Sequence, residues 1–62
     1  MTITLWLSQE GFWAYTPWQQ GRPQASGMVP REALACQTVE ELVAVLHRAV
    51  PQYSDCAVRV ED

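Results

Sequence analysis

One stretch of the chain has the 3.6-residue spacing of apolar positions that is typical of an amphipathic helix. It runs from Thr38 to Val50 and is followed by Pro51, which cannot continue a helix. Thr38 is a favourable N-cap, and the Glu41 carboxylate can reach back to accept a hydrogen bond from the Thr38 N–H. The apolar stripe of this helix is formed by Val39, Leu42, Val43, Leu46, Ala49 and Val50. The pattern therefore predicts one helix over 38–50 that lies on another structural layer.

Polar and apolar residues alternate from position 2 to position 8, which predicts a half-buried strand. Its inward residues would be Ile3, Leu5 and Leu7. Residues 9–11 provide a turn, in which Gly11 can adopt a positive φ. The aromatic segment 12–16 predicts the returning strand of a hairpin.

The loop length decides which hairpin residues share a face. If the loop is Glu10 and Gly11 alone, Trp6 pairs with Tyr15 and Leu7 pairs with Ala14. The helix-facing side would then be largely aliphatic, with Ile3, Leu5, Leu7, Phe12 and Ala14. The other side would be aromatic, with Trp6, Trp13 and Tyr15. Because one helix covers only one side of a sheet, the aromatic side would face water.

An exposed aromatic face of this kind is typical of a binding site or a dimer interface. Two alternatives remain open. The loop after Thr16, with Trp18 at its tip, could fold back over the rings. A register shifted by one residue would instead place the aromatic side chains in the core.

The rest of the chain adds shorter elements. Residues 17–23 are rich in turn formers and predict a surface loop, and 24–29 predict a short strand in which Gly27 is a bulge or a point of close approach. Residues 30–35 fit one or two helical turns, and a strand from Ala33 to Cys36 is also compatible; proline at the first position favours the helical turn. Alternation from 56 to 60 predicts the last strand.

Together these elements predict a single α+β domain over residues 1–62. It would consist of a small antiparallel sheet of three to four strands in the order β-β-(β)-α-β, with one amphipathic helix packed on one face.

The chain is acidic: seven Asp and Glu residues stand against four arginines, with no lysine, for a formal net charge of −3. A phosphate backbone requires a basic surface, so direct nucleic-acid binding is disfavoured. The acids could imitate phosphates, or they could form a solvated face that keeps a small protein soluble.

The N-terminus has neither a basic leader nor a long apolar run, so we expect a cytoplasmic protein without a membrane span. In that compartment Cys36 and Cys56 are expected to be reduced thiols.

No catalytic motif is present. His47 fits a half-exposed residue near the helix C-terminus, where a cation interacts well with the dipole. A metal site built from Cys36, His47, Asp55 and Cys56 lacks the paired spacing of a zinc motif. We therefore expect no metal, no cofactor and no enzymatic activity; the rival hypothesis is a small enzyme or metal protein that uses Cys36, His47 and Cys56.

A set of motifs in the middle of the chain resembles the HicB-type antitoxin domain. These motifs are Gly11-Phe12-Trp13-Ala14, the following Pro17, and the helix entry Thr38-Val39-Glu40-Glu41-Leu42 with Ala49 near the helix end. The family has a β-β-β-α-β order, and its members bind and occlude a small ribonuclease toxin. The chain departs from the family pattern in three ways. Trp18-Gln19-Gln20-Gly21 stands in place of a Pro-Gly turn, Cys36 stands in place of a glycine, and the interval from Pro17 to Thr38 is longer.

In size, acidity and one helix on a sheet, the chain also resembles the small anti-CRISPR proteins of phages. Some of these inactivate an effector complex through acidic residues that stand in for DNA. The corresponding candidates here are Glu10, Glu32, Glu40, Glu41, Glu61 and Asp62.

Both resemblances imply a protein of the bacterial cell, encoded by the bacterium or by a phage, that inhibits a partner protein by stoichiometric binding. The predicted partner-binding residues are Trp6, Trp13, Tyr15, Trp18, Glu40, Glu41, Glu61 and Asp62. Aromatic residues would anchor the contact, and the acids would steer a partner with a basic surface. The alternative is a homodimeric structural or regulatory protein whose aromatic face is the subunit interface.

Overall fold

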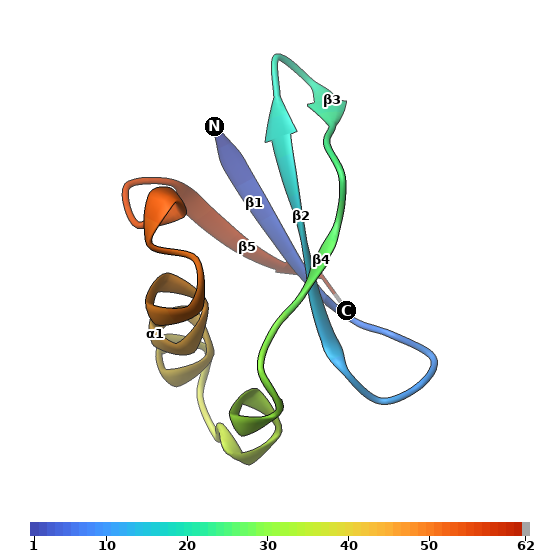
Figure 1. Ribbon diagram of the computed structural model, residues 1–62, viewed down its shortest axis with the longest axis vertical. Coiled ribbons are helices and arrows are strands. Elements are labelled where there is room, and N and C mark those ends of the chain that lie inside the picture. Colours follow the sequence, from blue (N-terminus) through green and yellow to red (C-terminus); the bar gives the residue numbers. More distant parts are fainter. Residues whose placement is uncertain (62) are drawn as a thin grey trace.

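A computed structural model describes residues 1–61 and shows one helix packed on one side of a mixed sheet (Figure 1). The elements, in chain order, are β1 (Thr2–Leu7), β2 (Trp13–Gln19), β3 (Arg22–Pro23), β4 (Gly27–Met28), the 3₁₀ helix η1 (Arg31–Ala35), α1 (Val39–Ala49), the 3₁₀ helix η2 (Pro51–Tyr53) and β5 (Ala57–Glu61). This arrangement confirms the predicted α+β class. Within residues 1–61, no helix has the length and apolar character needed to cross a membrane.

The sheet has the strand order β3-β2-β1-β5, and β4 also pairs with β2. We expected a purely antiparallel sheet, but β5 runs parallel to β1. The cause is the connection: β4 is antiparallel to β2 and so points the same way as β1. From β4 the chain crosses over the sheet by way of α1. β5 then runs in the same direction as β4, as is usual after a crossover connection. The strand beyond the predicted three to four is the two-residue β3, because the two-residue β4 falls within the strand predicted over 24–29.

The register of the first hairpin differs by one residue from the prediction. Ser8 and Phe12 close the loop through a backbone hydrogen bond of 2.8 Å, so the loop contains residues 9–11 rather than two residues. Gly11 has a φ of 88°, as the turn requires. Leu5 therefore pairs with Tyr15, and Leu7 pairs with Trp13.

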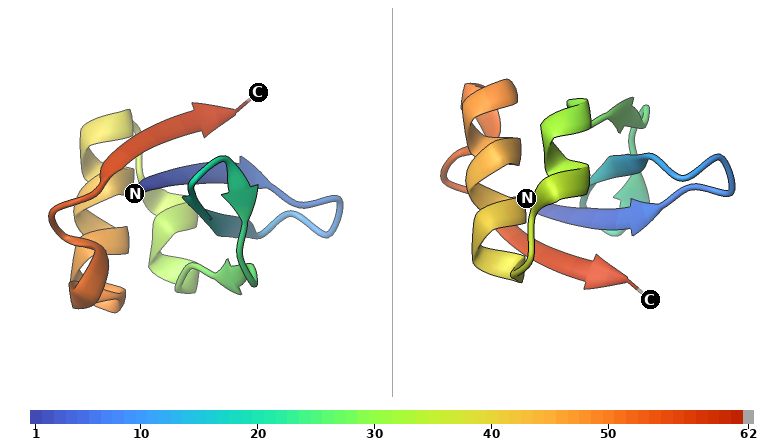
Figure 2. Two further views of the ribbon diagram at one scale, coloured as in Figure 1. Left: turned by 90° about the horizontal axis from the view of Figure 1, so that it is seen from above. Right: turned by 90° about the horizontal axis from the view of Figure 1, so that it is seen from below.

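This shift changes the composition of both sheet faces, because a slip of one residue moves every side chain of a strand to the other face. The side covered by α1, which we call the covered face, carries Ile3, Leu5, Leu7, Trp13, Tyr15 and Pro17. The prediction that Leu7 is buried is wrong, since it is 55% exposed. Leu7 lies at the hairpin end, which projects away from α1 (Figure 2).

A second hairpin replaces the predicted loop over 17–23. β2 continues to Gln19 and turns through Gln20 and Gly21, which both have positive φ, as in a type I′ turn. Proline has no N–H to donate to a neighbouring strand. β2 tolerates Pro17 because its ring nitrogen, like its carbonyl, faces the side where β3 has already ended. That carbonyl accepts a hydrogen bond of 2.7 Å from the Gln24 N–H.

The segment after β3 follows the sequence pattern more closely. Gly27 is a point of close approach, since a Cβ at this position would stand 2.5 Å from the Tyr15 ring. Residues 31–35 form η1, which confirms the helical alternative for this segment.

The predicted helix is confirmed as α1, with Thr38 as its N-cap and Val50 as its C-cap. The Glu41 N–H donates to Thr38 Oγ1 over 3.2 Å. The Glu41 carboxylate also reaches back, but it accepts a hydrogen bond from the Gln37 N–H over 2.9 Å rather than from that of Thr38. The capping box is therefore displaced by one residue from the expected arrangement.

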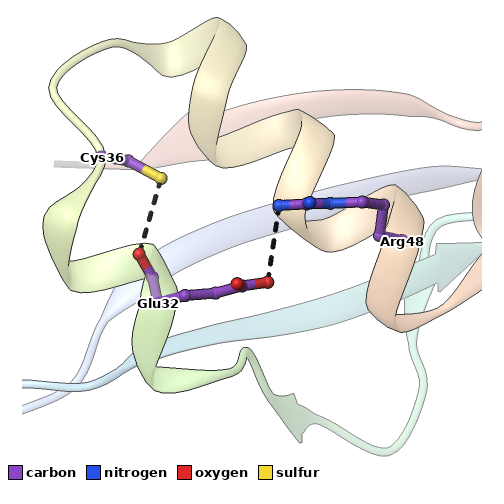
Figure 3. Close-up of polar contacts among 3 residues, drawn as sticks. All are labelled: Glu32, Cys36 and Arg48. Carbon is purple, nitrogen blue, oxygen red and sulfur yellow. Dashed lines mark hydrogen bonds and ion pairs between the residues drawn. The ribbon is translucent and has the colours of Figure 1, made fainter.

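The core lies between the covered face, α1 and η1. Its fully shielded side chains are Ile3, Leu5 and Leu46. The buried face of α1 is centred on Leu42, Val45 and Leu46, whereas Val39 is 56% exposed. Compared with the predicted apolar stripe, the buried side of α1 is thus shifted towards Val45, where η1 packs against the helix. Figure 3 shows an exposed ion pair of 3.5 Å between Arg48 of α1 and Glu32 of η1 on the same flank.

Candidate functional site

The side of the sheet opposite α1, which we call the open face, has no helix over it. Both α1 and η1 pack on the covered face (Figure 2). The strand register of β1, β2 and β5 places on the open face Thr2, Thr4, Trp6, Ala14, Thr16, Trp18, Ala57, Arg59 and Glu61, and the pairing of β3 and β4 adds Pro23 beside Trp18 and Met28 beside Ala14. These residues form three cross-strand rows, and β1 is the central strand of each row. The open face is therefore the side of the sheet over which no helix of the described chain packs.

Trp6 lies in the row between Ala14 and Glu61. Its indole N–H donates to Thr16 Oγ1 over 3.0 Å, which draws the ring diagonally across β2. Ala14 is only 2% exposed although it lies on the open face, and we infer that the Trp6 ring shields it. Thr16 in turn bonds Ser26 through a hydroxyl pair of 2.7 Å, so the Trp6 indole is held in a defined orientation.

Trp18 lines two shallow hollows at the open face, with volumes of about 570 and 470 Å³, and the second hollow extends to Leu7 and Trp13 at the end of the first hairpin. Thr4, Trp18 and Glu61 line both hollows. The Trp18 Nε1 atom is shielded from solvent and has no hydrogen-bond partner within residues 1–61. An unpaired buried donor costs about 1–3 kcal/mol. Trp18 therefore holds an unused hydrogen-bond donor in the row of the open face that it shares with Thr2 and Ala57.

Charged side chains of β5 border the two indoles. Arg59 lies beside Thr4, and Glu61 lies beside Trp6. Neither forms an ion pair with any other described residue. The open face thus combines apolar rings with one cation and one anion that are available to a binding partner.

The structure brings together only part of the predicted site. Trp6, Trp18 and Glu61 share the open face, as shown by the strand register. The expectation that Trp13 and Tyr15 share this face is wrong, because the three-residue loop shifts the hairpin register. Both residues pack against the core, and Tyr15 meets Tyr53 edge-on with ring centroids 6.0 Å apart.

The predicted acidic residues do not form one cluster. Glu40 and Glu41 lie in the first turn of α1, which packs on the covered side, and Glu41 is engaged in the helix cap. Asp62 lies outside the described residues. Among the described acids predicted to bind a partner, Glu61 alone lies beside the tryptophans.

Thr4, Thr16 and Arg59 belong to the site but were not predicted as site residues. Strand alternation already placed Thr4 and Arg59 on outward positions of their strands. The sequence pattern did not predict the parallel pairing of β5 with β1, which places Arg59 beside Thr4.

Residues considered for chemistry lie elsewhere. His47 is half-buried, as expected, and its Nε2 atom is shielded without a hydrogen-bond partner in the described chain. Cys36 and Cys56 are free thiols, and the Cys36 thiol points towards the Glu32 carbonyl at 3.9 Å (Figure 3). Within residues 1–61, no group of three or more His, Cys, Asp and Glu side chains could hold a metal ion.

Comparison with known proteins gives no match: no family model, no curated protein and no solved structure is similar to this chain.

Proposed function

We propose that this protein is a non-catalytic inhibitor that binds a nucleic-acid-handling protein of the bacterial cytoplasm in a stoichiometric complex. The open face would be its contact surface. The observation that carries this proposal is the position of Trp6 and Trp18 on a sheet face that no helix covers.

Tryptophan is enriched among the residues that contribute most to protein–protein binding, because its large ring buries much apolar area at low entropic cost. Trp6 is already oriented by Thr16, so little ordering is needed on binding. The indole N–H of Trp18 is unpaired. After a small rotation of the ring, it could donate a hydrogen bond to a carbonyl or carboxylate of the partner.

The class of partner is supported by sequence and topology. The element order, with the two-residue β3 set aside, agrees with the β-β-β-α-β order that the HicB-type resemblance implies. The net charge of −3 and the absence of lysine favour association with a basic protein over binding to nucleic acid. Among the described acids predicted to bind a partner, Glu61 alone lies on the contact surface. We therefore expect aromatic anchoring to outweigh electrostatic imitation of phosphates.

A binding assay with two groups of candidates tests the proposal. Calorimetry against the small ribonuclease toxins that HicB-type antitoxins bind and against CRISPR effector complexes should give a saturable complex of fixed stoichiometry with one group, together with loss of its nuclease activity. Trp18→Ala should weaken that complex at least about tenfold, since truncating an interface tryptophan removes on the order of 2 kcal/mol. Trp18→Phe, which keeps a ring but not the N–H, should give an intermediate affinity.

Leu34→Ala is the matched control, because Leu34 is a large exposed side chain of η1 outside the open face. Glu40→Arg tests the acidic helix start. If Glu40→Arg abolishes binding and Trp18→Ala does not, the contact surface is wrongly assigned. A dimer of the free protein that Trp18→Ala dissociates would instead identify the open face as a subunit interface.

A further inference from the structure

The outer edge of β5 is the second unusual surface of this molecule. β5 ends the strand order, and no described element lies along its outer side (Figure 2). Edge strands are usually protected by shortness, proline, charged side chains (lysine above all) or a bulge. The opposite edge follows this rule with the two-residue strands β3 and β4, and β3 contains Pro23. β5 has five residues without proline or lysine, and its two charged residues, Arg59 and Glu61, are of opposite sign.

The apolar side chains of β5 are incompletely covered. Val58 and Val60 point to the covered face and pack at the margin of the core, yet both are only half-buried. Their neighbours across the strand pair, Ile3 and Leu5, are 0% exposed. Figure 2 shows the reason: β5 starts beside α1 and runs away from it. An additional strand paired with residues 59–61 of β5 would therefore cover the apolar side chain of Val60 as well as satisfy backbone groups.

The residues of β5 are self-complementary in one antiparallel register. When Val60 stands opposite Val60 of a second copy, Arg59 stands opposite Glu61 of that copy, and this pairing occurs twice by symmetry. A register centred on Arg59 would instead place two arginines against each other. A register centred on Val58 would place Arg59 opposite Ala57 and form no ion pair.

We propose that two copies of the chain associate through antiparallel pairing of their β5 strands, with Val60 on the two-fold axis. The axis is perpendicular to the sheet, since directly opposed residues of antiparallel strands point to the same face. The sheet continues across both copies, and the two open faces lie on one side of it. The dimer thereby presents two tryptophan surfaces to a two-fold symmetric partner, which goes beyond the proposed inhibition and does not require it.

Sedimentation velocity over a wide concentration range, on the full chain without any partner, tests this dimer. The wild type should pass from monomer to dimer. Arg59→Glu and Glu61→Arg should each weaken the dimer about tenfold or more, because each places like charges opposite one another at both positions. The double variant R59E/E61R restores opposite charges and should restore association.

Two controls match these charge changes. Arg31→Glu on η1 and Glu40→Arg on α1 alter the same charges on exposed residues away from β5 and should leave the dimer unchanged. Circular dichroism establishes that every variant is folded. A wild type that stays monomeric, a single variant no weaker than its control, or a double variant that fails to recover would each overturn the proposal. Dimerisation that Trp18→Ala abolishes would also overturn it, because β5 pairing does not use that ring.

Discussion

Replacing Gly27 by alanine probes the corrected position of Tyr15. Gly27 pairs with Tyr15 across β2 and β4, and the ring lies over the glycine. A Cβ at position 27 would stand 2.5 Å from Cζ and Oη of Tyr15 and 2.6 Å from Cε1. Carbon atoms do not approach so closely, so the ring must move away from its contact with Tyr53 and from the core margin.

The expected cost is that of overpacking, about 1–3 kcal/mol. A domain of 62 residues has a free energy of unfolding of roughly 3–9 kcal/mol at about 0.05–0.15 kcal/mol per residue. Gly27→Ala therefore removes a substantial share of the total stability. The backbone itself does not oppose alanine, because the positive-φ glycines are Gly11 and Gly21, not Gly27.

Urea unfolding followed by tryptophan fluorescence measures this effect. With a denaturant slope near 1 kcal/mol/M, the midpoint should fall by about 1–3 M. The same substitution in a Tyr15→Leu background should cost about zero, or stabilise by about 0.4–1 kcal/mol through the unfolded state, because leucine lacks the clashing atoms.

An equal cost of Gly27→Ala in both backgrounds would refute the reasoning. It would mean that Tyr15 does not lie over Gly27, and hence that the observed register and the assignment of Tyr15 to the covered face are wrong.

Two further stability predictions concern the helix. Thr38→Ala should lower the free energy of unfolding by about 1 kcal/mol, measured by thermal unfolding, because the Glu41 N–H loses its acceptor; Gln37→Ala, which keeps the backbone donor, should have little effect. Leu46→Ala should cost about 2–5 kcal/mol, because Leu46 is 0% exposed, whereas Val39→Ala at the exposed helix start should cost less than about 1 kcal/mol. Equal losses for Leu46 and Val39 would mean that the buried side of α1 is misassigned.

The helix could be predicted from sequence because its signals are local. Thr38, the acids of the first turn and Pro51 fix its ends without reference to the rest of the chain. The side of the helix that is buried was less predictable, because Val45 becomes a core residue through packing at the η1 flank.

The candidate site was only partly predictable, because it depends on register and strand order. Residues 9–11 are compatible with a two-residue or a three-residue loop, and this choice moves Trp13 and Tyr15 from one face to the other. Trp18 was expected at a loop tip, and it joined the open face only because β2 continues through Pro17. The position of Glu61 beside Trp6 follows from a crossover that no short motif encodes.

The most direct test of the open face as the binding surface is a nuclear magnetic resonance titration of the indole N–H signals with the proposed partner protein. We predict that the signals of Trp6 and Trp18 change, and that the Trp18 signal moves towards the shift of a hydrogen-bonded donor, while the backbone amide signals of α1 on the covered side stay nearly unchanged. Unchanged Trp6 and Trp18 signals, together with changes at the amides of α1, would contradict the account and place the contact on the helix.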